Sequence, residues 1–222
     1  MYVPRHFQMS PDEARSALAQ VRLADLITVD PDTLGPVLTP VPFVYDRSVG
    51  EYGSFLGHLA RPNTQWAHTD HPALVVLRGG DAYVAPDWYP SYRGGKGTVP
   101  TWNYEVVQAT GTLVAHTDAA WLEAHLRALI AHHDPQYDLD AQDRATIDGM
   151  LRAIVGVEVR VTSVEGKSKL SQNRSVADIH GVADNLTSSG RDDLAERMRT
   201  VSVPYATARD AAVEAAREGA HS

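Results

Sequence analysis

The chain has 222 residues, of which 43% are hydrophobic and 22% are charged, and its formal net charge is −8. This composition is typical of a folded globular protein, and the absence of cysteine excludes disulfides, thiolate metal sites and cysteine nucleophiles. The negative net charge argues against a broadly basic surface for nucleic acid, so the charge does not support DNA as a partner. A local basic patch is still an alternative.

The first third of the chain is predicted to form a helix followed by strands. Ser10 and Glu13 have the spacing of a capping box, which satisfies two backbone donors at a helix N-terminus. The helix is expected to end before Asp30. Strand-forming residues then occupy 37–44 and 54–59, with a turn-rich stretch between them.

The middle of the chain is predicted to continue as an antiparallel meander. Segments 73–78 and 82–85 flank the sequence Gly-Gly-Asp at 79–81, where glycine can supply the positive φ of a tight hairpin. A long strand is expected over 104–116, with an interruption at Gly111.

The last third is predicted to be mostly helical around one clear strand. Helices are expected over 118–132 and 141–151. Between 157 and 162 valine alternates with polar residues, which predicts a strand with one buried face. Ser175 and Asp178 have the spacing of a second capping box.

These elements predict a mainly β fold with appended helices, of the α+β class. Strands and helices do not alternate regularly, which disfavours a doubly wound sheet and favours a small barrel with helices packed around it. We expect a single domain over 1–222, with a helical C-terminal extension over about 175–222. No stretch approaches the roughly 18 apolar residues of a membrane span and the first residues do not resemble a secretory signal, so we expect a cytoplasmic protein without a membrane partner.

A first candidate binding motif lies at the end of the strand over 54–59. His58, Arg61 and Asn63 bring an imidazole, a guanidinium and an amide to one turn. The planar guanidinium fork suits phosphate oxygens, so an anion site is chemically reasonable. A solvated hairpin end is the alternative interpretation.

A second motif places two aromatic side chains around an amide. Trp102 and Tyr104 could stack on a flat heteroaromatic ligand while Asn103 reads its polar edge. The alternative is a core tryptophan beside a cross-strand tyrosine.

A third motif lies between the last strand and the next helix, over 165–174. Lys167, Lys169 and Arg174 stand with Gln172 just before a helix N-terminus, where the helix dipole would add to their positive charge. A charged surface turn is the alternative. Together the three motifs supply the stacking surface, amides and compact positive charge that a phosphorylated planar cofactor requires.

The histidines do not predict a metal site. His68 and His71 lie in an expected loop and are interpreted as polar surface rather than ligands. His132 and His133 suit the negative end of a helix dipole, and His125 is interpreted as a partly buried structural residue. The sequence predicts no catalytic residue and no metal ligand.

The sequence resembles the PaiB family, described as FMN-binding negative transcriptional regulators, through several motifs that occur in the same order along the chain. The resemblance rests on five segments spread over most of the chain: MYVPRHF (1–7), GHLAR (57–61), AYVAPDWYP (82–90), VPTWNY (99–104) and GKSKLSQNR (166–174).

The resemblance implies a flavin split β-barrel that binds FMN at the interface of a homodimer. It implies that one turn and its neighbouring strand face the phosphate and ribityl chain, through Thr39, His58, Arg61 and Asn63. It implies flavin or dimer contacts from five further residues, which are Trp102, Asn103, Tyr104, Lys169 and Gln172. Two departures from the family pattern, Pro40 and Pro62, bear on the phosphate geometry because proline lacks a backbone donor.

The resemblance further implies a negative transcriptional regulator that senses flavin or redox state, although the sequence contains no convincing helix-turn-helix. The alternative is an FMN-dependent oxidoreductase in which the flavin carries the hydride or electrons for a small substrate. A third interpretation is a dimer that binds flavin or haem without turnover, with His58 or His116 as a haem ligand.

Overall fold

The structure is a computed structural model that describes residues 1–21, 23–92 and 99–219. Its strands are β1 (Leu23–Val29), β2 (Pro36–Pro42), β3 (Val44–Asp46), β4 (Ser54–Ala60), β5 (Pro72–Val84), β6 (Thr101–His116) and β7 (Ile154–Lys169). Its α-helices are α1 (Pro11–Ala19), α2 (Ala119–His133), α3 (Arg144–Arg152), α4 (Val176–Ser188), α5 (Asp192–Arg197) and α6 (Val203–Gly219). A π-helical turn, Met198–Ser202, joins α5 to α6, and 3₁₀ turns occur at Arg5–Phe7, Thr64–His68, Pro86–Trp88 and Leu139–Ala141.

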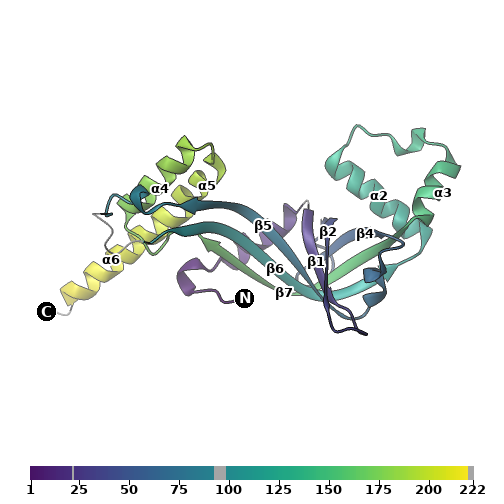
Figure 1. Cartoon of the computed structure of the whole chain (residues 1–222), viewed down its shortest axis with the longest axis horizontal. Helices are drawn as coiled ribbons and strands as arrows, with labels where there is room; N and C mark the ends of the chain where they lie inside the picture. The colour runs from purple at the N-terminus through teal and green to yellow at the C-terminus, as the bar shows by residue number, and fades with distance from the viewer. Residues whose placement is uncertain (22, 93–98, 220–222) are drawn as a thin grey trace. The chain divides into compact units, whose positions relative to one another are not determined.

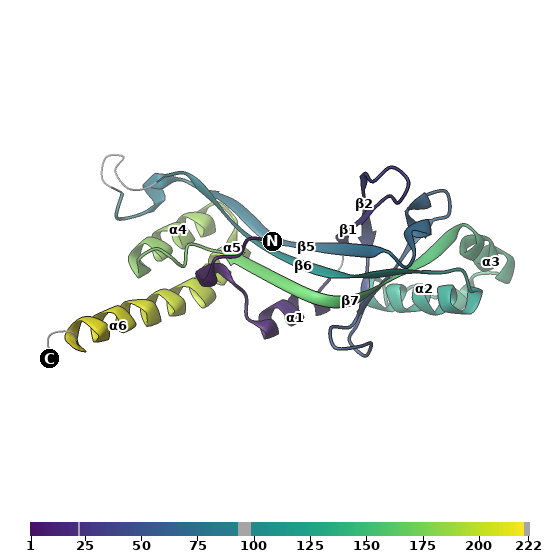
Figure 2. The same cartoon turned by 90° about the horizontal axis from the view of Figure 1, so that it is seen from below.

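The described strands form one sheet in the order β2-β1-β5-β6-β7-β4-β3 (Figures 1 and 2). Strand β1 pairs antiparallel with β2 and β5, and β4 pairs antiparallel with β3 and β7. Strands β2 and β4 are not neighbours in this order, yet they lie in contact, so the sheet curls into a half-barrel.

The chain divides into two compact units. Unit 1 comprises Met1, Ser10–Arg78 and Val107–Gly166, and unit 2 comprises Tyr2–Met9, Gly79–Val106 and Lys167–Ser222. The long strands β5, β6 and β7 each contribute one end to unit 1 and the other to unit 2. The helices expected over about 175–222 all belong to unit 2.

Unit 1 is built around the curled sheet, with α2 and α3 as its helical part. Phe43 and Phe55 are fully buried and lie with ring centroids 5.6 Å apart. Helices α2 and α3 pack on each other through a separate apolar cluster formed by Leu122, Leu126, Leu139, Ile147 and Leu151. This packing fixes α2, which carries His125.

Unit 2 has a core of its own, formed by the end of β5, the segment after it and Leu170 just after β7, packed with α4, α5 and α6. Its buried apolar side chains include Tyr89, Leu170, Ile179, Leu186 and Met198. Glu105 on β6 accepts hydrogen bonds from Arg197 of α5 and from Ser168 of β7, at 2.7 and 2.6 Å. This carboxylate therefore ties a C-terminal helix to two strands.

Two expected boundaries near the N-terminus differ in the structure. The capping box of Ser10 and Glu13 is confirmed, but the helix that it starts ends at Ala19. Strand β1 occupies Leu23–Val29, where no strand is expected from the sequence pattern. Its buried and exposed residues alternate, and pairing with β2 and β5 outweighs the helical spacing of the apolar residues before it.

The expected hairpin at 79–81 is wrong, because β5 runs through it as one strand from Pro72 to Val84. Gly79 serves close packing between strands instead of a turn. A Cβ placed on Gly79 would lie 2.8 Å from Cβ of Glu105, so glycine permits β6 to approach closely. Strand β6 is likewise uninterrupted at Gly111, where a Cβ would lie 2.2 Å from the carbonyl oxygen of Arg160.

The C-terminal segment also differs in detail. Strand β7 begins before 157 and extends to Lys169, so much of the segment over 165–174 is strand rather than loop. Ser175 caps α4 by accepting from the Asp178 N–H, but the Asp178 carboxylate accepts from Ser91 instead of closing a capping box. None of the described helices is both long enough and apolar enough to cross a membrane.

Candidate functional site

The first motif lies in unit 1, where the turn after β4 holds Arg61 against the start of β7. Arg61 Nε donates to the carbonyl oxygen of Arg152 at 2.7 Å, and Nη2 donates to that of Ile154 at 2.8 Å. Nη1 has no hydrogen-bond partner in the described part of the chain. The guanidinium is therefore fixed by the main chain and keeps one amino group for a ligand.

Asn63 and Thr39 meet beside this turn. Asn63 Nδ2 donates to Thr39 Oγ1 at 3.1 Å, while its Oδ1 accepts from the backbone N–H of Gln65. The Thr39 hydroxyl keeps its own proton for another acceptor. The structure thus brings together these two predicted site residues.

The two proline departures are accommodated by the backbone. Pro40 lies on β2, an edge strand of the described sheet, where a missing donor is tolerated. Pro62 lies in a turn that is closed by the N–H of Asn63, which donates to the carbonyl oxygen of Ala60 at 2.8 Å. The donor that proline lacks is not needed for this turn.

His58 on β4 is joined to His125 on α2, with 3.0 Å between Nδ1 of His58 and Nε2 of His125. The other nitrogen of His125, Nδ1, is buried and has no partner among the described residues. Burial lowers the pKa of His58, and burial with the neighbouring His58 lowers the pKa of His125 to about 4. Both rings are therefore neutral near pH 7.

The position of the shared proton follows from the buried Nδ1. If His58 donated, His125 would carry a proton on Nδ1 and leave a buried N–H without an acceptor, which costs about 1–3 kcal/mol. If instead His125 Nε2 donates to His58 Nδ1, the buried Nδ1 of His125 carries only a lone pair without a donor. The geometry therefore favours His58 with its proton on Nε2, which makes that nitrogen a donor for a ligand oxygen.

A tryptophan between two histidines extends this group, and the sequence analysis did not assign it to a site. The Trp121 ring stacks on His116 with centroids 4.0 Å apart and on His125 at 5.5 Å. His116 Nε2 lies 3.0 Å from the buried carboxylate of Glu158. The sequence signal for this group is weak, because it comes from residues on β6, α2 and β7.

A cavity of about 150 Å³ adjoins Arg61 in unit 1. Arg152 and Thr117 also line it, which suits an anion. Asp148 lines it as well and lies 2.7 Å from Arg144. The carboxylate makes this cavity less favourable for a doubly charged phosphate.

The second and third motifs lie in unit 2, where two predicted site residues have internal partners. The fully buried Asn103 accepts from Ser171 Oγ at 3.1 Å and donates to Sδ of Met198. Gln172 accepts from the backbone N–H of Leu170 and donates to the carbonyl oxygen of Ser168. These amides hold the turn after β7 in shape.

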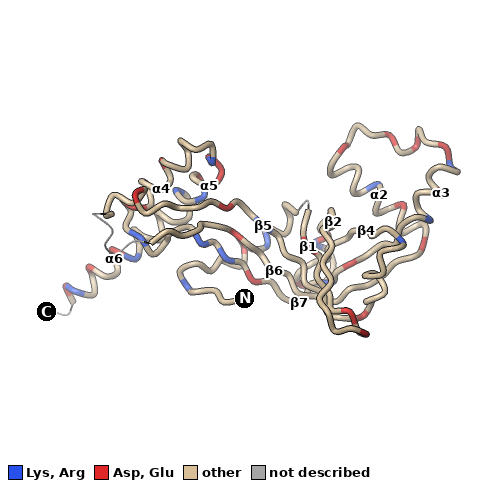
Figure 3. The backbone as a smooth tube through the Cα atoms, in the orientation of Figure 1, with Lys and Arg blue, Asp and Glu red and all other residues tan. Residues whose placement is uncertain are grey.

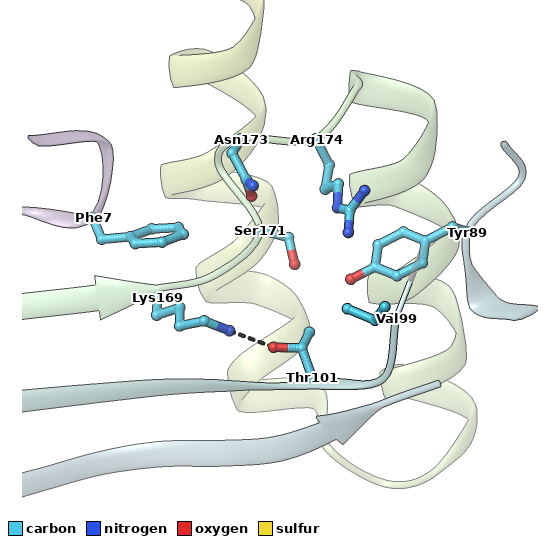
Figure 4. A pocket seen from close by; sticks show the side chains of 8 residues that line it. All are labelled: Phe7, Tyr89, Val99, Thr101, Lys169, Ser171, Asn173 and Arg174. Carbon is cyan, nitrogen blue, oxygen red and sulfur yellow. Dashed lines mark hydrogen bonds between the residues drawn. The ribbon is translucent and has the colours of Figure 1, made fainter. Parts of the chain in front are cut away.

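The other predicted residues of unit 2 are more accessible. Trp102 is 53% exposed and packs edge-on against Tyr83. Lys169 Nζ donates to Thr101 Oγ1 at 2.8 Å and to the carbonyl oxygen of Trp102, and it lies 5.8 Å from the centroid of the Tyr104 ring. Lys169 also lines a pocket within unit 2 (Figure 4).

The donors present fit a flavin phosphate and polyol. In unit 1, Arg61 Nη1, His58 Nε2 and the Thr39 hydroxyl donate to none of the described residues, and these donors match phosphate and hydroxyl oxygens. In unit 2, the aromatic ring of Tyr104 lies close to the ammonium group of Lys169. Direct contact of the nine predicted residues with a cofactor stays a prediction.

Comparison with known proteins gives the family. Residues 1–163 match the family described as "Putative FMN-binding domain". The chain belongs to this family. The flavin expectation is therefore confirmed at the level of the family, and so is the resemblance to PaiB.

Two curated relatives show how far the similarity extends. The protease synthase and sporulation protein PAI 2 of Bacillus subtilis is 27% identical over 192 residues, covering 84% of this chain and 89% of the relative. The uncharacterized protein YKL070W of Saccharomyces cerevisiae is 26% identical over 142 residues, covering 55% of this chain and 83% of the relative.

Solved structures confirm the fold class. The conserved hypothetical protein Rv2991 of Mycobacterium tuberculosis has a TM-score of 0.54 at 15% identity, covering 76% of this chain and 91% of that one. The FAD and haem binding protein of Mycobacterium smegmatis has a TM-score of 0.50 at 20% identity, covering 73% of each chain. The expected mainly β split-barrel fold with appended helices is confirmed, whereas the dimer stays a prediction.

Proposed function

We propose that this protein binds FMN as a homodimer and acts as a negative transcriptional regulator. The observation that carries the proposal is the family match, which spans residues 1–163 and includes the turn with His58, Arg61 and Asn63. The regulatory role follows from the resemblance to the PaiB family, to which the relative from Bacillus subtilis belongs.

In this proposal the turn after β4 receives the phosphate and ribityl chain. Arg61 offers Nη1 to a phosphate oxygen, and its other donors keep the guanidinium in place on the main chain. His58 offers an N–H to a neutral oxygen, which suits a ribityl hydroxyl. Thr39, held by Asn63, adds a hydroxyl.

In unit 2 the proposal assigns the aromatic contacts to Trp102 and Tyr104. The exposed indole of Trp102 offers a face for stacking, and Lys169 brings positive charge beside Tyr104. Asn103 and Gln172 act through the turn that they hold. FMN, when bound, supplies hydride and electron transfer.

Regulation through a protein partner suits the charge better than tight DNA binding. The chain carries a formal charge of −8, and counterion release on DNA needs clustered Lys and Arg. Flavin binding would then alter the surface offered to that partner.

Titration with FMN tests the cofactor. We expect saturable changes in flavin absorbance and fluorescence at one FMN per chain, and light scattering on the eluting protein should give twice the chain mass. A protein that leaves the FMN spectrum unchanged contradicts flavin binding, and the mass of a single chain contradicts the homodimer.

An assay for catalytic turnover distinguishes the regulator from the FMN-dependent oxidoreductase. We expect the FMN-loaded protein to show no steady-state oxidation of NADH or NADPH beyond that of free FMN. Sustained turnover at a rate proportional to protein concentration would contradict the regulator and favour the FMN-dependent oxidoreductase.

A further inference from the structure

A pocket of about 160 Å³ lies entirely within unit 2 (Figure 4). It is lined by Phe7, Tyr89, Val99, Thr101, Lys169, Ser171, Asn173 and Arg174. These residues come from the N-terminal segment, the segment between β5 and β6, the start of β6, and the end of β7 with the turn that follows it. The sequence identifies the last of these segments as a phosphate candidate, but not Tyr89.

The charged residues that line this pocket in the described part of the chain are both cationic. Lys169 and Arg174 line it, and none of the described lining residues is acidic. The Arg174 guanidinium lies over the Tyr89 ring, 4.7 Å from its centroid, and this side chain has no hydrogen-bond or ion-pair partner in the described part of the chain. Burial, with Lys167 and Arg174 nearby, lowers the pKa of Lys169, as expected for an ammonium group that lacks an anion.

The Tyr89 hydroxyl is a second and independent observation. Tyr89 is only 1% exposed, and its hydroxyl has no hydrogen-bond partner among the described residues. Figure 4 shows this hydroxyl directed into the pocket, toward the side on which Lys169 and Ser171 lie. Buried hydroxyls in folded proteins are nearly always paired, so this one indicates a missing acceptor.

The size and walls of the pocket limit what it can hold. Phe7 and Val99 give it apolar surface beside the two cations. A cavity of about 150 Å³ can hold a benzene ring. The three fused rings of a flavin are too large for it, whereas a phosphate or a carboxylate on one small ring fits.

The geometry points to an oxyanion site in unit 2, which takes a phosphate monoester or carboxylate on an apolar group no larger than one ring. Arg174 and Lys169 neutralise the anion, and the Tyr89 hydroxyl donates to it. The apolar remainder lies against Phe7 and Val99. This site is separate from the turn of Arg61, and its existence does not depend on flavin binding.

Calorimetric titration of the full chain with phenyl phosphate and with benzoate tests the site. We expect one saturable event per chain for at least one of these anions and none for benzyl alcohol, which has the ring without the charge. Arg174→Gln should weaken binding at least about tenfold, because it removes a charge-assisted donor. Arg191→Gln, a change outside the pocket in the same unit, should leave the affinity unchanged.

Tyr89→Phe is the sharper variant, because it removes only the hydroxyl. We expect binding to weaken about three- to tenfold, while the melting temperature of the free protein stays the same or rises. Absence of saturable binding by both anions, or an unchanged affinity in Arg174→Gln or Tyr89→Phe, would overturn the site.

Competition identifies the source of the anion. Displacement of phenyl phosphate by FMN but not by riboflavin assigns the site to the flavin phosphate. Retention of phenyl phosphate in the presence of FMN assigns it to a separate small ligand. Flavin absorbance reports FMN binding independently, so failure of flavin binding and failure of this site are distinguishable.

Discussion

At the scale of single residues, His125 makes stability depend on pH. The folded protein protonates His125 only near pH 4, whereas the unfolded chain does so near pH 6.5. Between these values the unfolded state binds more protons, so acidification favours unfolding. We expect this group to lower the free energy of unfolding by about 1–2 kcal/mol between pH 6.5 and pH 5.

Urea denaturation at these two pH values measures the effect. His125→Gln should flatten the pH dependence, because glutamine does not titrate. An equal loss of stability on acidification in the wild type and in His125→Gln would contradict the assignment.

Arg61 has two separable contributions, one to stability and one to ligand binding. Arg61→Ala removes two hydrogen bonds to main-chain carbonyl oxygens, so we expect the free energy of unfolding to fall by about 1–2 kcal/mol. The same substitution should lower the affinity for FMN at least about tenfold and the affinity for riboflavin much less, because the lost amino group contacts the phosphate.

Flavin fluorescence titrations with both ligands measure this difference. Arg47→Ala, another exposed arginine of unit 1, is the matched control and should alter neither affinity. An equal loss of affinity for FMN and riboflavin is inconsistent with a phosphate contact.

At the scale of elements, local chemistry predicted some boundaries well and others poorly. The capping box of Ser10 and Glu13 acts within one turn, so the sequence is sufficient to locate it. Strand β1 was missed because part of its stability comes from pairing with β5, which lies far along the chain, as well as with β2, the next strand. The glycines at 79–80 suggested a turn, although the close approach of β6 explains at least Gly79.

Two glycines of contrasting surroundings test this interpretation. Gly111→Ala places a Cβ against the main chain of β7, so we expect a loss of at least about 2 kcal/mol in the free energy of unfolding. Gly149→Ala lies inside α3 with open space around it and should gain about 0.5–1 kcal/mol. Chemical denaturation of both variants measures these changes, and wild-type stability in Gly111→Ala would refute the close-contact explanation.

The candidate site was predictable to the extent that its residues are neighbours in sequence. His58, Arg61 and Asn63 lie within one turn, and the structure keeps them there with Thr39. The pairing of His58 with His125 and the place of Tyr89 in the wall of a pocket depend on packing between distant elements. Sequence spacing carries little information about such contacts.

At the scale of the whole molecule, charge limits the partners. Lys and Arg are interspersed with Asp and Glu along both units, without a continuous basic stripe on the described backbone (Figure 3). We expect no retention of a random DNA duplex in a gel-shift assay, even at low salt. Retention that weakens steeply as salt rises would contradict this expectation.

The unpaired hydroxyl of Tyr89 has an evolutionary consequence. In a protein that does not bind the anion, phenylalanine at this position would give a more stable fold, because no buried donor would be left without an acceptor. Selection for stability alone would thus replace the tyrosine. Among homologous sequences, tyrosine should therefore accompany the arginine at the position of Arg174, and both should disappear together where the ligand is no longer used.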